Sequence, residues 1–432
     1  MSIFPTGDVA SLWQATRNAS PEFDHQLPSQ RQDVVIIGGG YTGLSSALYL
    51  AERGQTVVVI DANRVGWGAS GRNGGVVFGK FRVSFKDIAS RYGGDHARGM
   101  YRFGKESVDH LKHLVERFSI DADFRENGLV YCAHSAKAMR GLQADRDWLA
   151  DNLGETANTV LSAQEACLET GSPGFAGGIH FPKGGTIQPL NYVLGLARGV
   201  HRLGVSICEG TAALRIGRDR NGMIVETSQG PISAAQLLIA TDGYSALTPA
   251  TWSVKNGIIP FRSAMIATEK LPSELFASLM RGESSYHETR RMMRWFRKYD
   301  GRVIYGGRGA FGKQDSDSAF EGLRAAMIKQ FPSLSDVHID YQWSGLVSLT
   351  LDAMPHIGRV DDRLSYAVGY NGSGVAIASY AGRYAADVVL GRDTDASLIT
   401  LNPLRQVPLY AVREPAVRLI AGWYQFLDKA GF

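Results

Sequence analysis

The feature that most constrains this chain is a glycine-rich turn that directly follows its first apolar run, Val34–Ile37. A continuous apolar run of this length predicts a strand covered on both faces. Gly38, Gly40 and Gly43 follow in the spacing G-x-G-x-x-G. Apolar residues at helical spacing and a second apolar run come next, and that run ends in Asp61. The order strand, turn, helix, strand and acid therefore predicts a βαβ unit.

This unit has the form of a dinucleotide-binding site. The first glycine permits the tight turn, the second admits a pyrophosphate, and the third lets helix and strand pack closely. The helix N-terminus offers N–H groups and positive potential to the phosphates. Asp61, about twenty residues further on, is placed to accept hydrogen bonds from a ribose. A glycine-rich turn that serves packing alone is the alternative.

A second glycine-rich stretch, V-G-W-G-A-S-G-R-N-G-G at Val65–Gly75, distinguishes between dinucleotides. A nicotinamide-binding domain has no need of such a loop just after the ribose acid. FAD does need it, because FAD lies extended and the backbone must pass close to its pyrophosphate and ring. We therefore expect the cofactor to be FAD.

With these two motifs the chain resembles the D-amino-acid oxidase superfamily of FAD-dependent amine oxidases and dehydrogenases, and most of all its γ-glutamylputrescine oxidase branch. The resemblance extends over nearly the whole chain. It implies an α/β fold with a discontinuous, Rossmann-like FAD-binding domain and an inserted α+β substrate domain built on an antiparallel sheet. The residues expected to contact FAD are Gly38, Gly40, Tyr41, Thr42, Gly43, Asp61, Ala62, Trp67, Gly68, Ala69, Ser70, Arg72, Asn73, Gly74, Gly75, Ala213, Thr241, Gly243, Gly345, Gly369, Asn371, Gly372, Ser373, Gly374 and Val375.

Three later segments depart from the family pattern. Leu237–Tyr244 resembles the family's A-T-G segment, but Asp242 is inserted before the glycine. A helix start at Gly372–Gly374 is expected at the pyrimidine edge of the flavin, where its dipole stabilises negative charge. The family usually has His or another large polar residue where Ser373 stands. Sarcosine oxidases tether FAD through a Cys just before the segment that matches Thr350–Asp352, and no Cys is present here, so we expect non-covalent FAD.

The expected domains follow from the resemblance and from changes in sequence texture. They are an N-terminal arm (1–32), an FAD-binding domain (33–88, 158–250 and 343–400), a substrate-binding domain (89–157 and 251–342) and a C-terminal amphipathic helix (401–432). Core packing or a dimer contact is the expected role of that helix, and a peripheral membrane contact is the alternative.

Substrate contacts are expected on the strand R-V-I-Y-G-G, which the resemblance places near the flavin. Tyr305 and Arg308 are the expected contacts, because an Arg there can hold a carboxylate bidentately. Sarcosine oxidases place a Lys on this strand, and the matching residue here is Ile304. Arg302 shares the face of Ile304 and is the expected substitute cation. No catalytic acid or base is identified, since the flavin carries the chemistry.

Two other patterns have less specific interpretations. The glycines of 307–312 repeat G-x-G-x-x-G and, with Lys313, approach a phosphate-binding loop. Gln314 stands where such a loop needs Ser or Thr, and polar residues follow where a helix should begin, so we expect a hairpin.

Basic and aromatic residues alternate over 290–298. This pattern favours an edge strand with one solvent-exposed face, and RNA binding is the alternative.

The composition narrows the class of protein. A net charge of +4 does not indicate a nucleic-acid partner. The three cysteines, Cys132, Cys167 and Cys208, are scattered without metal-ligand spacing, which is typical of a reduced, cytoplasmic protein without a metal. No signal peptide is recognisable, and no apolar run approaches the roughly 20 residues of a membrane span.

The sequence therefore predicts an FAD-dependent oxidoreductase that oxidises a primary or secondary amine or an amino acid. A substrate C–H delivers hydride to flavin N5, and the resulting imine hydrolyses. Oxygen or another acceptor then takes the electrons. A 2-hydroxy-acid or polyol dehydrogenase and a flavin-containing RNA-modifying protein remain the alternatives.

Overall fold

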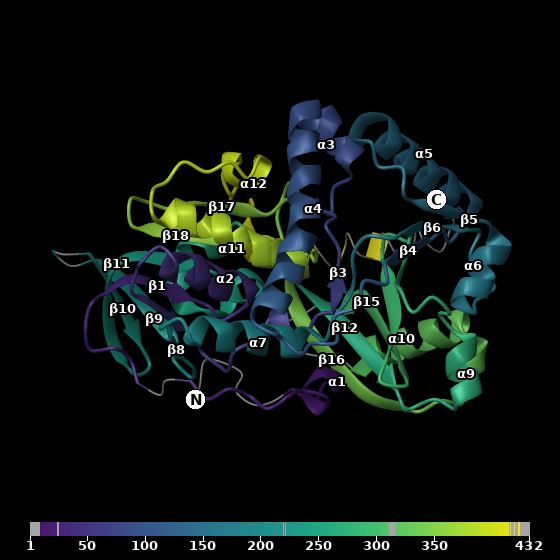
Figure 1. Ribbon diagram of the computed structural model, residues 1–432, viewed down its shortest axis with the longest axis horizontal. Coiled ribbons are helices and arrows are strands. Elements are labelled where there is room, and N and C mark those ends of the chain that lie inside the picture. Colours follow the sequence, from purple (N-terminus) through teal and green to yellow (C-terminus); the bar gives the residue numbers. More distant parts are fainter. Residues whose placement is uncertain are drawn as a thin grey trace.

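The computed structural model describes residues 9–23, 26–218, 220, 222–310, 317–413, 415, 419, 422 and 423, without the side chains of 308–310. Within these residues, two eight-stranded sheets and one two-stranded sheet form the framework. The two large sheets lie side by side, and helix α4 (Gly94–Arg117) stands between them in the view of Figure 1. The two-stranded sheet pairs β3 (Val76–Val77) with β7 (Gly185–Thr186).

The first sheet is parallel at its centre. Its order is β17 (His356–Arg359), β18 (Leu364–Val368), β11 (Gly230–Ile239), β1 (Gln32–Ile37), β2 (Val57–Ile60) and β8 (Ser206–Cys208), with β10 (Met223–Thr227) and β9 (Ala213–Arg218) attached to β11. β1 pairs in parallel with both β2 and β11, and β11 with β18. The turns that follow these strands therefore gather at one edge of the sheet, where ligands bind in open α/β sheets.

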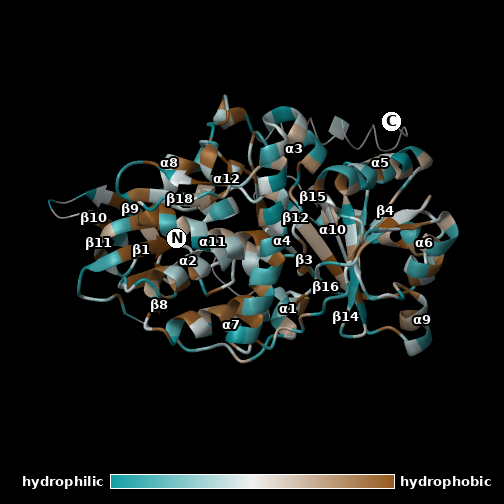
Figure 2. Ribbon diagram, turned by 45° about the horizontal axis from the view of Figure 1, so that its top comes forward, coloured by the Kyte–Doolittle hydropathy of each residue, from teal (hydrophilic) through white to brown (hydrophobic). Residues whose placement is uncertain are grey.

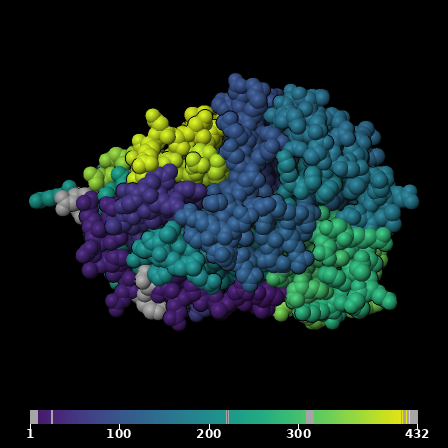
Figure 3. All heavy atoms as spheres, viewed as in Figure 1, coloured from purple at the N-terminus to yellow at the C-terminus, as the bar shows by residue number. Residues whose placement is uncertain are grey.

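Both faces of this sheet are covered. Val34 and Ile36 face a core that includes α2 (Tyr41–Ala51), α7 (Pro189–His201) and α11 (Val375–Val389). Val35 and Ile37 face a second core on the opposite side. The apolar run predicted as a doubly buried strand is thus confirmed. Residues near the N-terminus (purple) lie beside those near position 400 (yellow), so this half is built from segments far apart in sequence (Figure 3).

The second sheet is mostly antiparallel. Its order is β16 (Ile339–Leu349), β12 (Ile259–Thr268), β15 (Arg302–Ala310), β14 (Arg294–Tyr299), β13 (Ser285–Glu288), β4 (Leu129–Cys132), β6 (Gly178–Phe181) and β5 (Thr159–Leu161). Helix α10 (Asp317–Gln330) covers one face, where Phe320 and Met327 join a core with Tyr305 and Phe296. The other face is turned toward the first sheet.

The remaining helices are peripheral. They are α1 (Leu12–Ala15), α3 (Phe85–Tyr92), α5 (Ala136–Leu153), α6 (Ala163–Thr170), α8 (Trp252–Lys255), α9 (Ser273–Ser278) and α12 (Leu398–Leu401). Helix α5 buries Met139 and is otherwise largely hydrophilic (Figure 2). No helix in the described part of the chain is long and apolar enough to cross a membrane.

The structure differs from the sequence-based expectations at three places. Strands β5, β6 and β16 belong to the second sheet, although the expected boundaries put 158–250 and 343–400 in the FAD-binding domain. β16 pairs with β12 along its whole length, so the chain crosses back only after Leu349. β14 is an interior strand, not the expected edge strand. Gly312 and about half of the predicted C-terminal helix, including 424–432, lie outside the described residues.

Candidate functional site

A continuous cavity joins the turns of the first sheet to the open face of the second sheet. Most residues expected to contact FAD line it: Gly38, Gly40, Tyr41, Thr42, Asp61, Ala62, Trp67, Gly68, Ala69, Ser70, Arg72, Asn73, Gly74, Ala213, Thr241, Gly345, Asn371, Gly372, Gly374 and Val375. They come from turns that follow β1, β2, β11 and β18, together with β9 and β16. Segments from across the chain therefore meet at this cavity.

Two helix N-termini open into this cavity. Gly40 is the N-cap of α2 and Gly374 the N-cap of α11, so neither N-cap residue has a side chain to bond the first N–H groups of its helix. Both N-cap residues line the cavity. The first N–H groups of a helix lack intrahelical partners and carry positive potential. The cavity therefore offers two sites for negative charge, as a pyrophosphate and the pyrimidine edge of a flavin require.

Asp61 ends β2 and is held by the two turns beside it. Its Oδ2 accepts a hydrogen bond from Gly39 N at 2.8 Å, and its Oδ1 accepts one from Asn63 N at 2.9 Å. Burial raises the pKa of Asp61 to about 6, against the lowering effect of these two N–H groups. A carboxylate in this position has lone pairs left for ribose hydroxyls. The sequence-predicted acid thus lines the cavity directly after β2.

The second glycine-rich loop is fastened to the start of α2. The Tyr41 hydroxyl lies 2.7 Å from Ser70 O and 3.0 Å from Pro189 O, and its single proton can be donated to either carbonyl group. Ser70 Oγ accepts from Tyr41 N at 3.1 Å, and Asn73 Nδ2 donates to Ser70 O at 2.9 Å. The Arg72 guanidinium lies 4.1 Å from the centre of the Trp67 ring. These bonds hold the loop against the cavity.

Asp242, the insertion in the A-T-G-like segment, connects three of the converging segments. It lies in the left-handed backbone region at φ 42°. Its Oδ1 accepts hydrogen bonds from Ser348 Oγ and from Gly369 N, the latter at 2.8 Å. Burial raises the pKa of this carboxyl group. Asp242 lines the cavity, so the insertion fixes the turn after β11 to the ends of β16 and β18.

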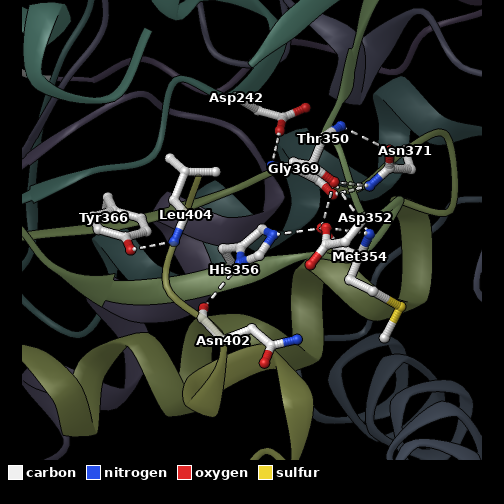
Figure 4. Close-up of polar contacts among 10 residues, drawn as sticks. All are labelled: Asp242, Thr350, Asp352, Met354, His356, Tyr366, Gly369, Asn371, Asn402 and Leu404. Atoms are coloured by element: carbon white, nitrogen blue, oxygen red, sulfur yellow. Dashed lines mark hydrogen bonds and ion pairs between the residues drawn. The ribbon is translucent and has the colours of Figure 1, made fainter. Parts of the chain in front are cut away.

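A hydrogen-bonded network continues outward from this point (Figure 4). Asn371 Oδ1 accepts from Thr350 N at 3.0 Å. Asp352 Oδ1 lies 3.0 Å from His356 Nε2, and His356 Nδ1 lies 3.0 Å from Asn402 O. His356 is buried, and both of its nitrogens face oxygen acceptors. The network therefore fixes the loop that carries Asn371 to the segment after α12.

Five residues expected to contact FAD do not line the cavity: Gly43, Gly75, Gly243, Gly369 and Ser373. Gly43 serves packing, because a Cβ on it would lie 2.0 Å from Gly38 O. Gly75 and Gly369 adopt positive φ angles, 66° and 90°, in turns that bring neighbouring residues to the cavity. The glycine spacing in the sequence indicates tight turns, but it does not indicate which residues of a turn face the cavity.

The floor of the cavity is formed by the second sheet. His287, Trp295, Gly306 and Met265 stand directly opposite one another on β13, β14, β15 and β12. Opposed residues of neighbouring strands point to the same face. His287, Trp295 and Met265 line the cavity. This row brings together residues that no single sequence motif contains.

Tyr305 was expected to contact the substrate, and the structure does not bring it to the cavity. It pairs with Ile266 and Phe296, which face α10. Its ring stacks on Phe296 at 5.9 Å between centroids. Because alternate residues of a strand point to opposite faces, Tyr305 lies behind the floor, and its neighbour Gly306 belongs to the floor.

The structure describes the side chain of only one of the two arginines expected near Tyr305, Arg302 and Arg308. Arg302 shares the face of Ile304, as expected, but it donates to Thr268 O at 2.6 Å and is paired with Asp340. Neither Arg302 nor Ile304 lines the cavity, so Arg302 is not positioned as the substitute cation. The side chain of Arg308 lies outside the described part of the chain.

The basic and aromatic run at 290–298 builds part of the site. Met293 and Trp295 line the cavity. Arg297 is buried and donates to Gly75 O at 3.1 Å and to Ile187 O at 3.0 Å. Arg294 Nη1 lies 3.6 Å from Oε1 of the buried Glu288. The expected solvent-exposed face is therefore absent from this described strand, and the RNA-binding interpretation loses its basis.

Other residues that line the cavity were not predicted to do so: Ile37, Asn63, Gly66, Val76, Arg82, Thr211, Ala240, Asp242, Tyr244, Leu247, Thr248, Phe261, Ser263, Met265, His287, Met293, Trp295, Leu346, Val347, Leu349, Tyr370 and Ala378. About half adjoin a predicted FAD contact and could have been added from chain proximity. No sequence pattern pointed to the lining residues on the second sheet, apart from the alternation of basic and aromatic residues over 290–298.

Comparisons with known proteins agree with this architecture. The family described as DAO, FAD dependent oxidoreductase, matches residues 33–388. The chain is 32% identical over 434 residues to gamma-glutamylputrescine oxidoreductase of Escherichia coli (strain K12), covering 99% of this chain and 100% of that protein. Glycine oxidase from Geobacillus kaustophilus superposes with a TM-score of 0.73 at 21% identity, over 88% of this chain and 99% of that one. L-proline dehydrogenase from P. horikoshii superposes with a TM-score of 0.71 at 20% identity, over 85% of this chain and 96% of that one. The predicted fold is confirmed.

Proposed function

This chain belongs to the family of FAD-dependent oxidoreductases, and from that premise we propose that it oxidises a small amine or amino acid. The observation that carries the proposal is the continuous cavity, into which the N-termini of α2 and α11 open and whose floor on the second sheet carries Met265 and Trp295. The names of the E. coli relative and of the glycine oxidase neighbour support an amine or amino-acid substrate.

Each part of the cofactor has a matching group in the cavity. Asp61 would accept from the adenosine ribose, the α2 N-terminus would face the pyrophosphate, and the α11 N-terminus would face the pyrimidine edge. When bound, FAD supplies a two-electron acceptor. The positive potential at the α11 N-terminus, where Gly374 is the N-cap, would stabilise negative charge on that edge of a reduced cofactor.

The chain itself orients the substrate and keeps water away. Met265 and Trp295 present an apolar surface on the sheet side of the cavity, which favours a neutral amine over its hydrated ammonium form. Bound FAD would accept a hydride from the carbon next to the substrate nitrogen, whose lone pair would form C=N with loss of one N–H proton. Water would hydrolyse the imine, and oxygen or another acceptor would take the two electrons.

The test is anaerobic addition of substrates to the FAD-loaded protein while the flavin absorbance is recorded. The panel contains primary amines, secondary amines, amino acids, 2-hydroxy acids and polyols. We expect amines or amino acids to bleach the flavin, because their nitrogen lone pair assists hydride departure. Bleaching by hydroxy acids or polyols alone would overturn the proposal and favour the alternative dehydrogenase.

A further inference from the structure

The last residues of the second glycine-rich loop are held by two buried indoles. Trp343 Nε1 donates a hydrogen bond to Arg72 O at 3.0 Å, and Trp13 Nε1 donates one to Asn73 O at 2.9 Å. Both indoles are almost wholly buried, and they meet edge to face with ring centroids 6.0 Å apart. Two successive peptide groups of the loop are therefore fixed by side chains from outside the loop.

Trp13 lies on α1 and joins the N-terminal arm to both halves of the molecule. Its carbonyl oxygen accepts a hydrogen bond at 3.0 Å from Nε2 of Gln188, the N-cap of α7. Its ring centroid lies 5.1 Å from that of Tyr299, and the Arg297 guanidinium lies 5.0 Å from the centre of the indole. Both of these residues belong to β14 of the second sheet, and α1 lies beside β16 in Figure 1. These contacts fix the direction in which the indole N–H points.

The peptide group that Trp13 binds differs from its neighbours in its N–H group. Asn73 N donates to Ala69 O at 3.2 Å, and Gly75 N donates to Asn73 Oδ1 at 2.8 Å. Gly74 N has no hydrogen-bond partner among the described residues. The C=O and N–H of a trans peptide point in opposite directions, so Trp13, by binding Asn73 O, directs the Gly74 N–H away from the arm. Gly74 lines the cavity, so this N–H is available to a bound group.

Gly74 lies at the end of the cavity that adjoins the second sheet. A Cβ on Gly74 would lie 3.1 Å from Nε1 of Trp295, which belongs to the cavity floor. Gly40 and Asp61, the residues expected at the pyrophosphate and the ribose, follow β1 and β2 of the first sheet. The ring of FAD that exchanges electrons must approach the substrate. The Gly74 N–H is therefore placed for this ring and not for the nucleotide.

We propose that Trp13 is a positioning residue for the redox-active ring of FAD. By binding Asn73 O, it keeps the Gly74 N–H directed to the cavity, where this donor favours the negative charge that the ring gains on reduction. Trp343 binds the preceding peptide group, whose N–H is already bonded within the loop, and serves packing alone. The inference requires bound FAD, and it does not depend on which substrate is oxidised.

The experiment compares Trp13→Phe with Trp343→Phe. Each change removes one indole N–H from the same loop and keeps an aromatic ring in the core. Titration of the apoprotein gives the dissociation constants of oxidised FAD and, without oxygen, of reduced FAD. We expect Trp13→Phe to weaken reduced FAD about tenfold more than oxidised FAD, equivalent to a midpoint potential about 30 mV more negative. Trp343→Phe should weaken both forms equally, and Trp252→Phe, on the exposed surface of α8, should change neither.

A second replacement separates the lost hydrogen bond from lost packing. Benzothienylalanine in place of Trp13 has sulfur where the indole has N–H and keeps nearly the same shape. It should reproduce the change in the affinity ratio, and it covers the case in which Trp13→Phe does not fold. The visible absorption spectrum of bound FAD should change with both replacements of Trp13 and stay unchanged in Trp343→Phe.

Two results would overturn the inference while leaving amine oxidation intact. One is an unchanged affinity ratio with both replacements of Trp13, and the other is an equal change of the ratio in Trp343→Phe. Failure of every amine to bleach the flavin would instead refute the proposed function, and it would leave these measurements standing because they need only FAD.

Discussion

Replacing Asp61 with asparagine tests whether this carboxylate binds the ribose of FAD. Without FAD the buried carboxyl group has a pKa of about 6, raised from 3.8. That increase corresponds to at most about 3 kcal/mol, at 1.36 kcal/mol for each pKa unit. Because the folded-state pKa is raised, the cost is absent below about pH 4, grows as the pH rises, and is complete above about pH 6.

Ribose hydroxyls donate to the charged carboxylate, so FAD binding should favour its deprotonated form. FAD affinity of the wild-type protein should therefore increase up to tenfold per pH unit below about pH 6 and level off above it. Asp61→Asn carries no charge at any pH, so its affinity should be nearly flat. At pH 7.5 the variant should bind FAD roughly 10- to 150-fold more weakly, the equivalent of about 1.5–3 kcal/mol for a hydrogen bond to a charged group.

Two measurements check this reasoning. FAD titration of the apoprotein, followed by flavin fluorescence from pH 5 to 8, gives the affinities. Urea unfolding of the apoprotein at pH 4.5 and 7.5 gives the stabilities, and the difference between variant and wild type should change by about 2 kcal/mol in favour of the variant at high pH, because about 1 kcal/mol of the cost is already present at pH 4.5. Asp151→Asn, on the exposed surface of α5, is the control. Equal FAD affinity of Asp61→Asn and wild type, or a wild-type affinity independent of pH, would refute the assignment.

Three further predictions concern the cofactor and its reoxidation. Gly43→Ala should lose FAD on gel filtration, because its Cβ would lie 2.0 Å from Gly38 O, whereas Gly141→Ala, with open space around it, should keep its flavin; retention by both would contradict the packing role. FAD should be non-covalent, since the described cysteines do not line the cavity; acid precipitation should leave the yellow colour in the supernatant, and a coloured, washed pellet would contradict this. Oxygen should reoxidise the flavin more slowly than a quinone-type dye, because the uncharged Ile304 matches the lysine position of sarcosine oxidases; Arg302→Ala should leave both rates unchanged, because Arg302 does not line the cavity, and equal rates with oxygen and dye in stopped flow would disprove the prediction.

The nucleotide end of the cavity was predictable because its geometry is local. A strand, a glycine turn and a helix within residues 34–51 fix one another through short-range sterics, so the residue spacing alone places Gly38 and Gly40 at the cavity. Asp61 was predictable for the same reason, because it comes directly after the second strand of the same βαβ unit. Asp242 was noticed only as an insertion, and its role became clear once Ser348 and Gly369 were seen to bond to it.

The substrate end was not predictable because it depends on register between strands. A shift of one residue moves every side chain of a strand to the other face. The strand R-V-I-Y-G-G was identified correctly, but Tyr305 faces α10 and Gly306 faces the cavity. The floor unites residues from β12, β13, β14 and β15, and only their pairing shows that they meet.

Arg297 shows how the two ends of the cavity are connected. Its position in a basic run suggested a solvent-exposed face, yet burial lowers its pKa only to about 10, so it stays charged inside the protein near neutral pH. It donates to the carbonyl groups of Gly75 and Ile187. Gly75 ends the flavin loop, while Trp295, two residues before Arg297 on β14, lies on the cavity floor. The same strand therefore carries part of the floor and binds the loop beside it, through a buried cation that the sequence pattern alone assigned to the surface.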